Sequence, residues 1–277
     1  MPSSEAHGAE DERELEALLR SVRRVTGMDF AGYARSTVRR RLHDVTVRRG
    51  CGGLEALHAL ALARASAMRD VVEALCVSVT AMFRDPEFFG AYRAIAVPRL
   101  RAGGAVRAWH PGCATGEEVW SHLIVLEEEG LGTHARLYGT DVSVAALRTA
   151  TEGALPLDRM REYTAAYQRS RGAGDFSAYY TAEASRAVVR PRLRRAARFA
   201  RHDLTADAPF GTFDVVFCRN LLIYFGAGLQ ERVHARLAAS VRPGGILALG
   251  RGEALSRTVR DRYEELDARN RIFLRVG

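Results

Sequence analysis

The chain has 277 residues, with 41 Lys+Arg against 33 Asp+Glu and a formal net charge of +8. Its composition, 47% hydrophobic and 27% charged, is that of an ordinary globular protein, so fibrous and wholly disordered classes are excluded, and no apolar run is long enough to predict membrane insertion. The polar, acidic first residues are unlike a secretory signal peptide, and the 4 scattered cysteines lack metal-ligand spacing, so we expect a cytoplasmic protein with reduced thiols and no metal site.

The first third of the chain has helical periodicity. We expect residues 1–11 to be a disordered tail and residues 12–89 an all-helical N-terminal domain, because apolar residues recur at three- and four-residue spacing. The second amphipathic stretch carries the arginines Arg39, Arg40 and Arg41. Such a cluster can bind an acidic protein surface or nucleic acid, or can simply face water. The chain contains no lysine, so all 41 of its Lys+Arg residues are arginines.

After this domain, short apolar strands alternate with helices. The expected strands cover residues 106–110, 135–140, 213–218 and 246–250, with helices between them. This alternation predicts an α/β fold with a mostly parallel, doubly wound sheet over residues 90–277. Residues 177–201 break the alternation and predict a small antiparallel β-subdomain insertion, and residues 263–276 predict a hairpin at one sheet edge.

The turn after the first strand is the first chemical signal. Gly112 and Gly116 flank it, and two acids, Glu117 and Glu118, begin the following helix. Glycine-bearing turns at the carboxyl edge of a parallel sheet bind nucleotide-like ligands. Two acids would repel a pyrophosphate but suit a sulfonium or ammonium group, which favours S-adenosylmethionine over NAD. The alternative is a plain tight turn whose acids are favoured by the helix dipole.

The second signal is Asp141, which follows the second strand. An acid at this position can accept both hydroxyls of a ribose. It can equally be the N-cap of the next helix, and the two roles can coexist.

Two further stretches place polar residues beside apolar ones. Arg219 and Asn220 follow the strand at 213–218, and Tyr224 follows them. Arg84 ends an apolar run between the two halves of the chain. Polar residues at a strand's carboxyl end suit a ligand site, whereas a tyrosine among aliphatic residues is usually core and a lone arginine usually forms a surface ion pair.

Together these stretches resemble the CheR-type protein-glutamate O-methyltransferases of bacterial chemotaxis. The resemblance rests on residues 80–84, 113–121, 140–141 and 217–225, in the order that the family has them, and it extends over residues 12–277. It implies a Rossmann-like S-adenosylmethionine-dependent methyltransferase domain, preceded by an all-helical domain and carrying a small inserted antiparallel β-subdomain.

The resemblance also implies roles for individual residues. Arg84 and Tyr224 would face the methyl acceptor and form the catalytic pair. The cofactor S-adenosylmethionine would be surrounded by Ser78, Thr80, Arg84, Gly112, Glu117, Glu118, Asp141, Asp203, Leu204, Arg219 and Asn220. A glutamate acceptor is already ionised at neutral pH, so the transfer needs orientation rather than a general base.

The implied partner is a chemoreceptor-like protein whose acidic methylation helices meet Arg39, Arg40 and Arg41. The turn at 183–186 lacks the glycine-rich loop of family members that dock a receptor's C-terminal peptide, so tethering through such a peptide is not expected. The basic clusters lack interleaved aromatics, which argues against nucleic acid as a partner, and we expect a monomer.

Departures from the family pattern keep two other functions open. Ser78 replaces the usual asparagine, residues 119–120 replace Pro-Tyr, and residues 250–253 replace Gly-His-Ser-Glu. The chain could therefore methylate a small molecule or another protein. It could also be a regulatory module that binds S-adenosylmethionine or S-adenosylhomocysteine without turnover.

Overall fold

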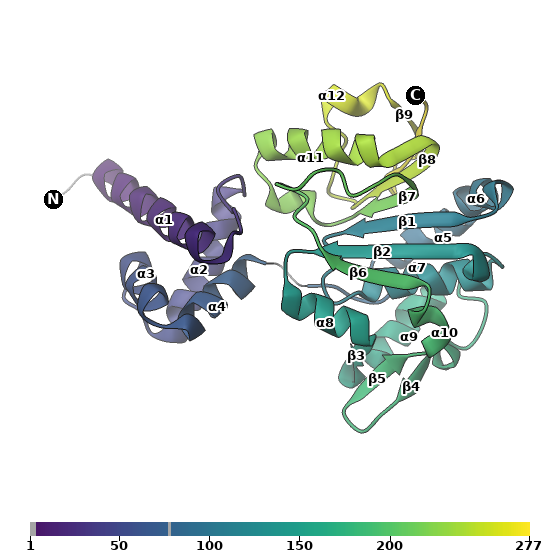
Figure 1. Ribbon diagram of the computed structural model, residues 1–277, viewed down its shortest axis with the longest axis horizontal. Coiled ribbons are helices and arrows are strands. Elements are labelled where there is room, and N and C mark those ends of the chain that lie inside the picture. The colour runs from purple at the N-terminus through teal and green to yellow at the C-terminus, as the bar shows by residue number, and fades with distance from the viewer. Residues whose placement is uncertain (1–3, 77–78) are drawn as a thin grey trace. The chain divides into compact units, whose positions relative to one another are not determined.

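The computed structural model describes residues 4–76 and 79–277, which form two compact units. We call the described part of Met1–Val77, together with Tyr224–Leu229, the N-terminal unit, and the described part of Ser78–Ile223, together with Gln230–Gly277, the sheet unit (Figure 1). No helix within the described residues is both long and apolar enough to cross a membrane.

The N-terminal unit is helical. Its helices are α1 (Ser4–Thr26), α2 (Arg35–Arg49), α3 (Leu54–Ala63) and α4 (Ala65–Leu75). The expectation of a disordered tail over residues 1–11 is wrong for residues 4–11, which are the first turns of α1. One reason is that Asp11 and Glu12 form ion pairs with Arg39 of α2 at 2.7 and 2.6 Å, so the helix gains partners at this end.

The sheet unit contains the predicted mostly parallel sheet. Its strands are β1 (Val106–Pro111), β2 (Ala135–Asp141), β6 (Ala197–Arg201), β7 (Phe213–Cys218), β8 (Val241–Leu249), β9 (Tyr263–Asp267) and β10 (Ile272–Arg275). They lie in the order β6-β2-β1-β7-β8-β10-β9, and all neighbours are parallel except the pairs that β10 makes with β8 and β9 (Figure 1). The parallel strands therefore bring their carboxyl ends to one edge, where ligands bind in such sheets.

Helices accompany this sheet. They are α5 (Pro86–Ile95), α6 (Val97–Gly103), α7 (Glu117–Glu128), α8 (Val144–Glu152), α11 (Ala227–Ser240) and α12 (Arg257–Arg260), with short 3₁₀ turns η1 (Gly132–His134) and η4 (Leu222–Tyr224). The predicted domain boundary at residue 89 lies too far along the chain. Phe88, Phe89 and Tyr92 of α5 are fully buried in the core of the sheet unit, so this helix belongs to the second unit.

The inserted subdomain has different limits from those predicted. It runs through β3 (Ala154–Pro156), η2 (Leu157–Arg159), α9 (Met160–Arg169), η3 (Phe176–Tyr179), β4 (Tyr180–Ala182), β5 (Arg186–Val189) and α10 (Pro191–Arg194), and its three strands form an antiparallel sheet. The expected insertion at 177–201 therefore starts too late and ends too late. Residues 197–201 are β6, which pairs with β2 in the main sheet.

Candidate functional site

The loop between β1 and α7 has a backbone that requires glycine. Gly112 and Gly116 have φ values of +67° and +93°, and a Cβ on Gly112 would lie 2.8 Å from a methyl carbon of Leu221. The Cys113 N–H donates to the Thr140 carbonyl at 3.0 Å, which ties the loop to the end of β2. The loop therefore curls tightly at the carboxyl edge of the sheet, where the sequence analysis placed the nucleotide-like ligand.

Asp141, at the end of β2, connects two such loops. Its carboxylate accepts the Ala114 N–H at 2.9 Å and the Ser143 N–H at 2.8 Å. It is not the N-cap of α8, because the Ser143 hydroxyl performs that task by accepting the Ala146 N–H. Burial raises the pKa of Asp141 although backbone N–H groups oppose the shift. A carboxylate has further lone pairs beyond those used by these N–H groups, so Asp141 is suited to accept ribose hydroxyls as well.

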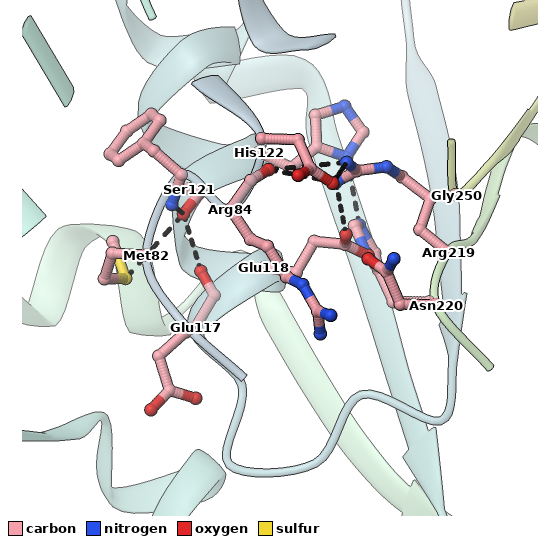
Figure 2. A network of polar contacts seen from close by, with 12 residues as sticks. Met82, Arg84, Glu117, Glu118, Ser121, His122, Arg219, Asn220 and Gly250 are labelled. Carbon is pink, nitrogen blue, oxygen red and sulfur yellow. Dashed lines mark hydrogen bonds and ion pairs between the residues drawn. The ribbon is translucent and has the colours of Figure 1, made fainter. Parts of the chain in front are cut away.

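The two acids at the start of α7 have opposite surroundings. Glu117 is 3% exposed, receives a hydrogen bond from the Thr115 hydroxyl at 2.7 Å, and has its pKa raised by burial. Burial would also raise the pKa of Glu118, but Arg219 and His110 outweigh that effect and leave the pKa below its ordinary value. Figure 2 shows the Glu117 carboxylate pointing away from the contacts around Glu118. Glu117 is therefore the acid of this pair that is available to a cationic ligand.

Arg219 is the centre of a buried ion-pair cluster. Its side chain is 1% exposed and forms ion pairs of 2.8 Å with both Glu118 and Asp85. Its guanidinium also lies 3.8 Å from the centroid of the Phe88 ring and donates to the Arg84 carbonyl. Arg219 thus contacts protein groups through both terminal nitrogens and holds the Arg84 carbonyl, while its buried Nε has no hydrogen-bond partner within the described residues.

A histidine pair continues this cluster into the core. His110 Nδ1 lies 3.2 Å from Glu118, His110 Nε2 lies 3.0 Å from His122 Nδ1, and His122 Nε2 lies 2.7 Å from the Tyr92 hydroxyl. Burial, followed by the charge of His110, lowers the pKa of His122 well below its usual value. His122 is therefore a neutral hydrogen-bonding group.

The segment that carries Arg84 is fixed by its backbone. The Phe83 N–H donates to the Ser121 hydroxyl at 2.8 Å, and Phe83 and Asp85 have positive φ values of 52° and 56°. The Arg219 guanidinium donates to the Arg84 carbonyl. In Figure 2 the Arg84 guanidinium extends away from these dashed contacts. Its backbone is immobilised while its guanidinium lies apart from the cluster.

Glu253 holds the loop after β7 and is absent from the predicted site. Its carboxylate, 4% exposed, accepts N–H groups from Gly250, Asn220, Leu222 and Ile223 at 2.6 to 3.3 Å. Asn220 has a φ of 59°, and a Cβ on Gly250 would approach the Asn220 nitrogens to within 2.9 Å. The sequence signal was the resemblance of residues 250–253 to the family's Gly-His-Ser-Glu, in which Gly250 and Glu253 are kept.

The remaining predicted cofactor residues lie in the loops around this edge. Asp203 and Leu204 are 6% exposed and follow β6, and Asp203 accepts both the backbone N–H and the hydroxyl of Thr205. The Thr80 carbonyl accepts a hydrogen bond from Arg159 at 2.9 Å. Ser78 lies outside the described residues.

Tyr224 belongs to the N-terminal unit. Its carbonyl accepts the Ala34 N–H at 2.9 Å, and the Arg41 guanidinium lies 5.5 Å from the centroid of its ring. Arg41 also donates to the Ala74 carbonyl at 3.2 Å, while Arg39 is paired with Asp11 and Glu12. Of the three arginines singled out in the sequence, Arg40 is the exposed one.

The arrangement of the sheet unit fits S-adenosylmethionine. Asp141 and Glu117 are buried carboxylates with raised pKa values, and the buried Tyr163 hydroxyl has no hydrogen-bond partner within the described residues. Carboxylates of this kind can accept hydrogen bonds from ribose hydroxyls and an ammonium group, and the Tyr163 hydroxyl can donate one. No cluster of three or more potential metal ligands occurs in residues 4–76 and 79–277.

Comparison with known families matches nearly the whole chain. Residues 78–272 match the model described as "CheR methyltransferase, SAM binding domain", and residues 13–76 match "CheR methyltransferase, all-alpha domain". The boundary between the two matches coincides with the division between the two units.

Curated relatives agree with these matches. A protein of Pseudomonas putida named "Putative methyltransferase Cher3" is 35% identical over 94% of this chain and 96% of its own length. A "Chemotaxis protein methyltransferase" of Listeria innocua is 29% identical over 85% of this chain and 88% of its own length. A "Chemotaxis protein methyltransferase 1" of Pseudomonas aeruginosa is 28% identical over 92% and 94%, respectively.

Proposed function

The chain belongs to the CheR methyltransferase family, and from that premise we propose that it methyl-esterifies glutamate side chains of a chemoreceptor-like protein. Methyl transfer that depends on S-adenosylmethionine follows from the family itself. The observation that carries the choice of acceptor is Arg84. Its backbone is fixed by Ser121 and Arg219, and its guanidinium donates to the Val79 carbonyl at 3.3 Å and forms no ion pair within the described residues.

A carboxylate acceptor is the partner that such a guanidinium lacks. Arginine binds carboxylates through two parallel charge-assisted hydrogen bonds, which fix the direction of the oxygen lone pairs. A glutamate with a pKa of about 4.3 is ionised at neutral pH and needs no general base. The contribution of this chain is therefore to orient the acceptor and to exclude water.

Bound S-adenosylmethionine supplies a methyl group on a positively charged sulfur. In the transfer, a bond forms between a glutamate oxygen and the methyl carbon as the bond from that carbon to sulfur breaks, leaving S-adenosylhomocysteine. The residues that we propose to hold the cofactor are those of the loops at the carboxyl edge, namely Thr80, Gly112, Glu117, Asp141, Asp203, Leu204 and Asn220. Within the sheet unit, Arg84 faces the acceptor, and Glu118 and Arg219 position Arg84.

The proposed protein partner presents acidic helices to the arginines of α2. Arg40 and Arg48 are exposed and form no ion pair in the described part of the chain, whereas Arg39 and Arg49 are already paired. We assign no receptor-peptide tether to the β4–β5 turn, because Glu183 and Arg186 close it by an ion pair of 3.0 Å. In this proposal the protein acts as a cytoplasmic monomer.

The test measures transfer of a radiolabelled methyl group to a chemoreceptor cytoplasmic fragment. The account predicts labelled product that releases methanol in mild base, as a glutamate methyl ester does. Arg84→Met should lower the transfer rate by more than about 100-fold, equivalent to about 2.7 kcal/mol, and should affect S-adenosylhomocysteine binding much less. The matched control is Arg99→Met, since Arg99 is an exposed arginine of the same unit.

Two outcomes would replace this proposal. Label that survives mild base would indicate methylation of nitrogen or carbon and therefore another acceptor. Tight binding of S-adenosylhomocysteine with no transfer to any receptor fragment would favour a regulatory binding module.

A further inference from the structure

One buried tyrosine beside the proposed cofactor site is not used by the account above. Tyr163, on α9 of the inserted subdomain, is 0% exposed, and its hydroxyl has no hydrogen-bond partner within residues 4–76 and 79–277. Leaving a buried hydroxyl unpaired costs about 1–3 kcal/mol, so such a group calls for an explanation.

The surroundings of Tyr163 connect it to two proposed cofactor residues. The Arg159 guanidinium lies 4.9 Å from the centroid of the Tyr163 ring, and the same guanidinium donates to the Thr80 carbonyl at 2.9 Å. Burial, followed by the nearby charge of Glu117, raises the pKa of Tyr163, so the phenol is a neutral donor close to that carboxylate. Arg159 also acts on Glu117, whose pKa it lowers against the larger effect of burial.

This grouping combines the Glu117 carboxylate and the neutral Tyr163 hydroxyl with the Arg159 guanidinium, which is itself paired with Glu162 at 2.9 Å. The Glu117 carboxylate accepts from the Thr115 hydroxyl and from its own backbone N–H, while the Tyr163 O–H has no hydrogen-bond partner in the described part of the chain. A zwitterion is complementary to such a set, because its ammonium group seeks the carboxylate and its own carboxylate seeks the donors. The amino-acid end of S-adenosylmethionine is a zwitterion of this kind.

We propose that the Tyr163 hydroxyl donates a hydrogen bond to the α-carboxylate of S-adenosylmethionine, with Glu117 accepting from the α-ammonium and Arg159 positioning the tyrosine ring. The inference rests on the proposed cofactor site and assigns the inserted subdomain a part in it. Tyr163 discriminates between adenosyl ligands by the presence of their carboxylate, and its contact does not involve the methyl acceptor.

The test is a calorimetric titration of Tyr163→Phe and wild type with three ligands. S-Adenosylmethionine has both groups of the zwitterion, decarboxylated S-adenosylmethionine has only the ammonium, and 5′-methylthioadenosine has neither. The variant should bind S-adenosylmethionine about tenfold more weakly, as expected for loss of a hydrogen bond to a charged group. Its affinities for the other two ligands should stay within about twofold of wild type.

Tyr263→Phe is the matched control. Tyr263, on β9, is also buried and its hydroxyl also lacks a partner in the described part of the chain, but no hydrogen bond or ring contact among the described residues joins its side chain to the residues of the site. The control should bind all three ligands as wild type does. Both variants should unfold at or above the wild-type temperature, because each loses an unpaired buried hydroxyl.

Each other outcome overturns a specific part of the account. Unchanged affinity of Tyr163→Phe for S-adenosylmethionine would overturn the inference and leave the proposed function intact. Equal weakening for the decarboxylated ligand would show that the hydroxyl contacts the ammonium instead, and weakening for 5′-methylthioadenosine too would indicate general distortion. Failure of wild type to bind S-adenosylmethionine would overturn the cofactor site and this inference together.

Discussion

Two polar regions of the sheet unit start from adjacent residues and differ in how completely they are satisfied. Glu118 leads into a cluster with Arg219, Asp85 and His110 in which most polar groups have partners (Figure 2). Glu117 leads into a region in which its buried carboxylate is bonded to the neutral Thr115 hydroxyl and the buried Tyr163 hydroxyl has no hydrogen-bond partner within the described residues. Buried polar groups that are satisfied build the structure, whereas those that are unsatisfied point to a ligand. The contrast therefore divides the site into a scaffold and a binding surface.

The largest expected effect is on the scaffold. Arg219→Met leaves the Glu118 and Asp85 carboxylates without their cation, which should lower the free energy of unfolding by about 3–5 kcal/mol. Urea denaturation measures the change. The control is Arg242→Met, which removes an ion pair with Asp214. Because the Arg242 side chain is 44% exposed, this substitution should lower the free energy of unfolding by less than about 1 kcal/mol. Equal effects of the two variants would contradict the structural role of Arg219.

The next effect is expected at Glu253. Glu253→Gln keeps the shape of the side chain but replaces one acceptor oxygen by an NH₂ group that faces backbone N–H groups. The free energy of unfolding should fall by about 1.5–3 kcal/mol, and hydrogen exchange at Asn220 and Leu222 should accelerate. Glu264→Gln, at an exposed position, is the control. Unchanged exchange in the loop would show that Glu253 does not hold it.

Replacing each of the adjacent acids Glu117 and Glu118 by glutamine should affect the free energy of unfolding differently. At neutral pH, Glu118→Gln should lower the free energy of unfolding by about 1 kcal/mol, because a neutral amide binds Arg219 less strongly. Glu117→Gln should leave it unchanged or raise it, because burial penalises the charged form of Glu117. Thermal unfolding of both variants measures the pair.

The pH dependence sharpens this comparison. The pKa of Glu117 is raised, so its destabilising effect is present at neutral pH and disappears once the pH falls below the ordinary value of 4.5. The pKa of Glu118 is lowered, so its stabilising effect persists below 4.5 and is lost only when the pH passes its folded-state pKa. The measurement is the free energy of unfolding of each variant and of wild type as a function of pH. If both variants reach the wild-type value at the same pH, the assignment is contradicted.

The smallest effect on stability concerns the arginine-rich helix α2. Arg40→Ala should change the free energy of unfolding by less than about 0.5 kcal/mol, as is usual for exposed residues without specific contacts. It should nevertheless raise the KM for a receptor fragment, and more so at low salt. Arg39→Ala breaks the ion pairs with Asp11 and Glu12, so it should lower the free energy of unfolding more than Arg40→Ala does and raise the KM less. An unchanged KM for Arg40→Ala would remove Arg40 from the acceptor surface.

Much of the fold was predictable because it depends on local pattern. The strands at 106–110, 213–218 and 246–250 are apolar runs between turn residues, and the structure confirms them as β1, β7 and part of β8. The strand β6 was missed because Arg198, Ala200 and Arg201 are exposed at a sheet edge, so its sequence lacks the apolar run of a central strand. The strand β3 was missed because three residues show no periodicity.

The site was predictable in its loops but not in the state of its side chains. Gly112, Glu117 and Asp141 follow strand ends, so their shared edge could be expected from a parallel sheet. The difference between Glu117 and Glu118 depends on Arg219, which is about a hundred positions along the chain and whose ion pair forms only on folding. Glu253 lies in the segment 250–253 that was compared with the family's Gly-His-Ser-Glu, but its backbone contacts form only on folding. Tyr163 could not be singled out, because a lone tyrosine carries no spacing signal.

The most direct test of the division between scaffold and binding surface is the dissociation constant of S-adenosylhomocysteine for Glu117→Gln and for wild type, measured by calorimetry at neutral pH. The account predicts that the variant binds at least about tenfold more weakly, because a neutral amide replaces the carboxylate that meets the ammonium group, while its unfolding temperature does not fall. Affinity equal to that of wild type would contradict the account.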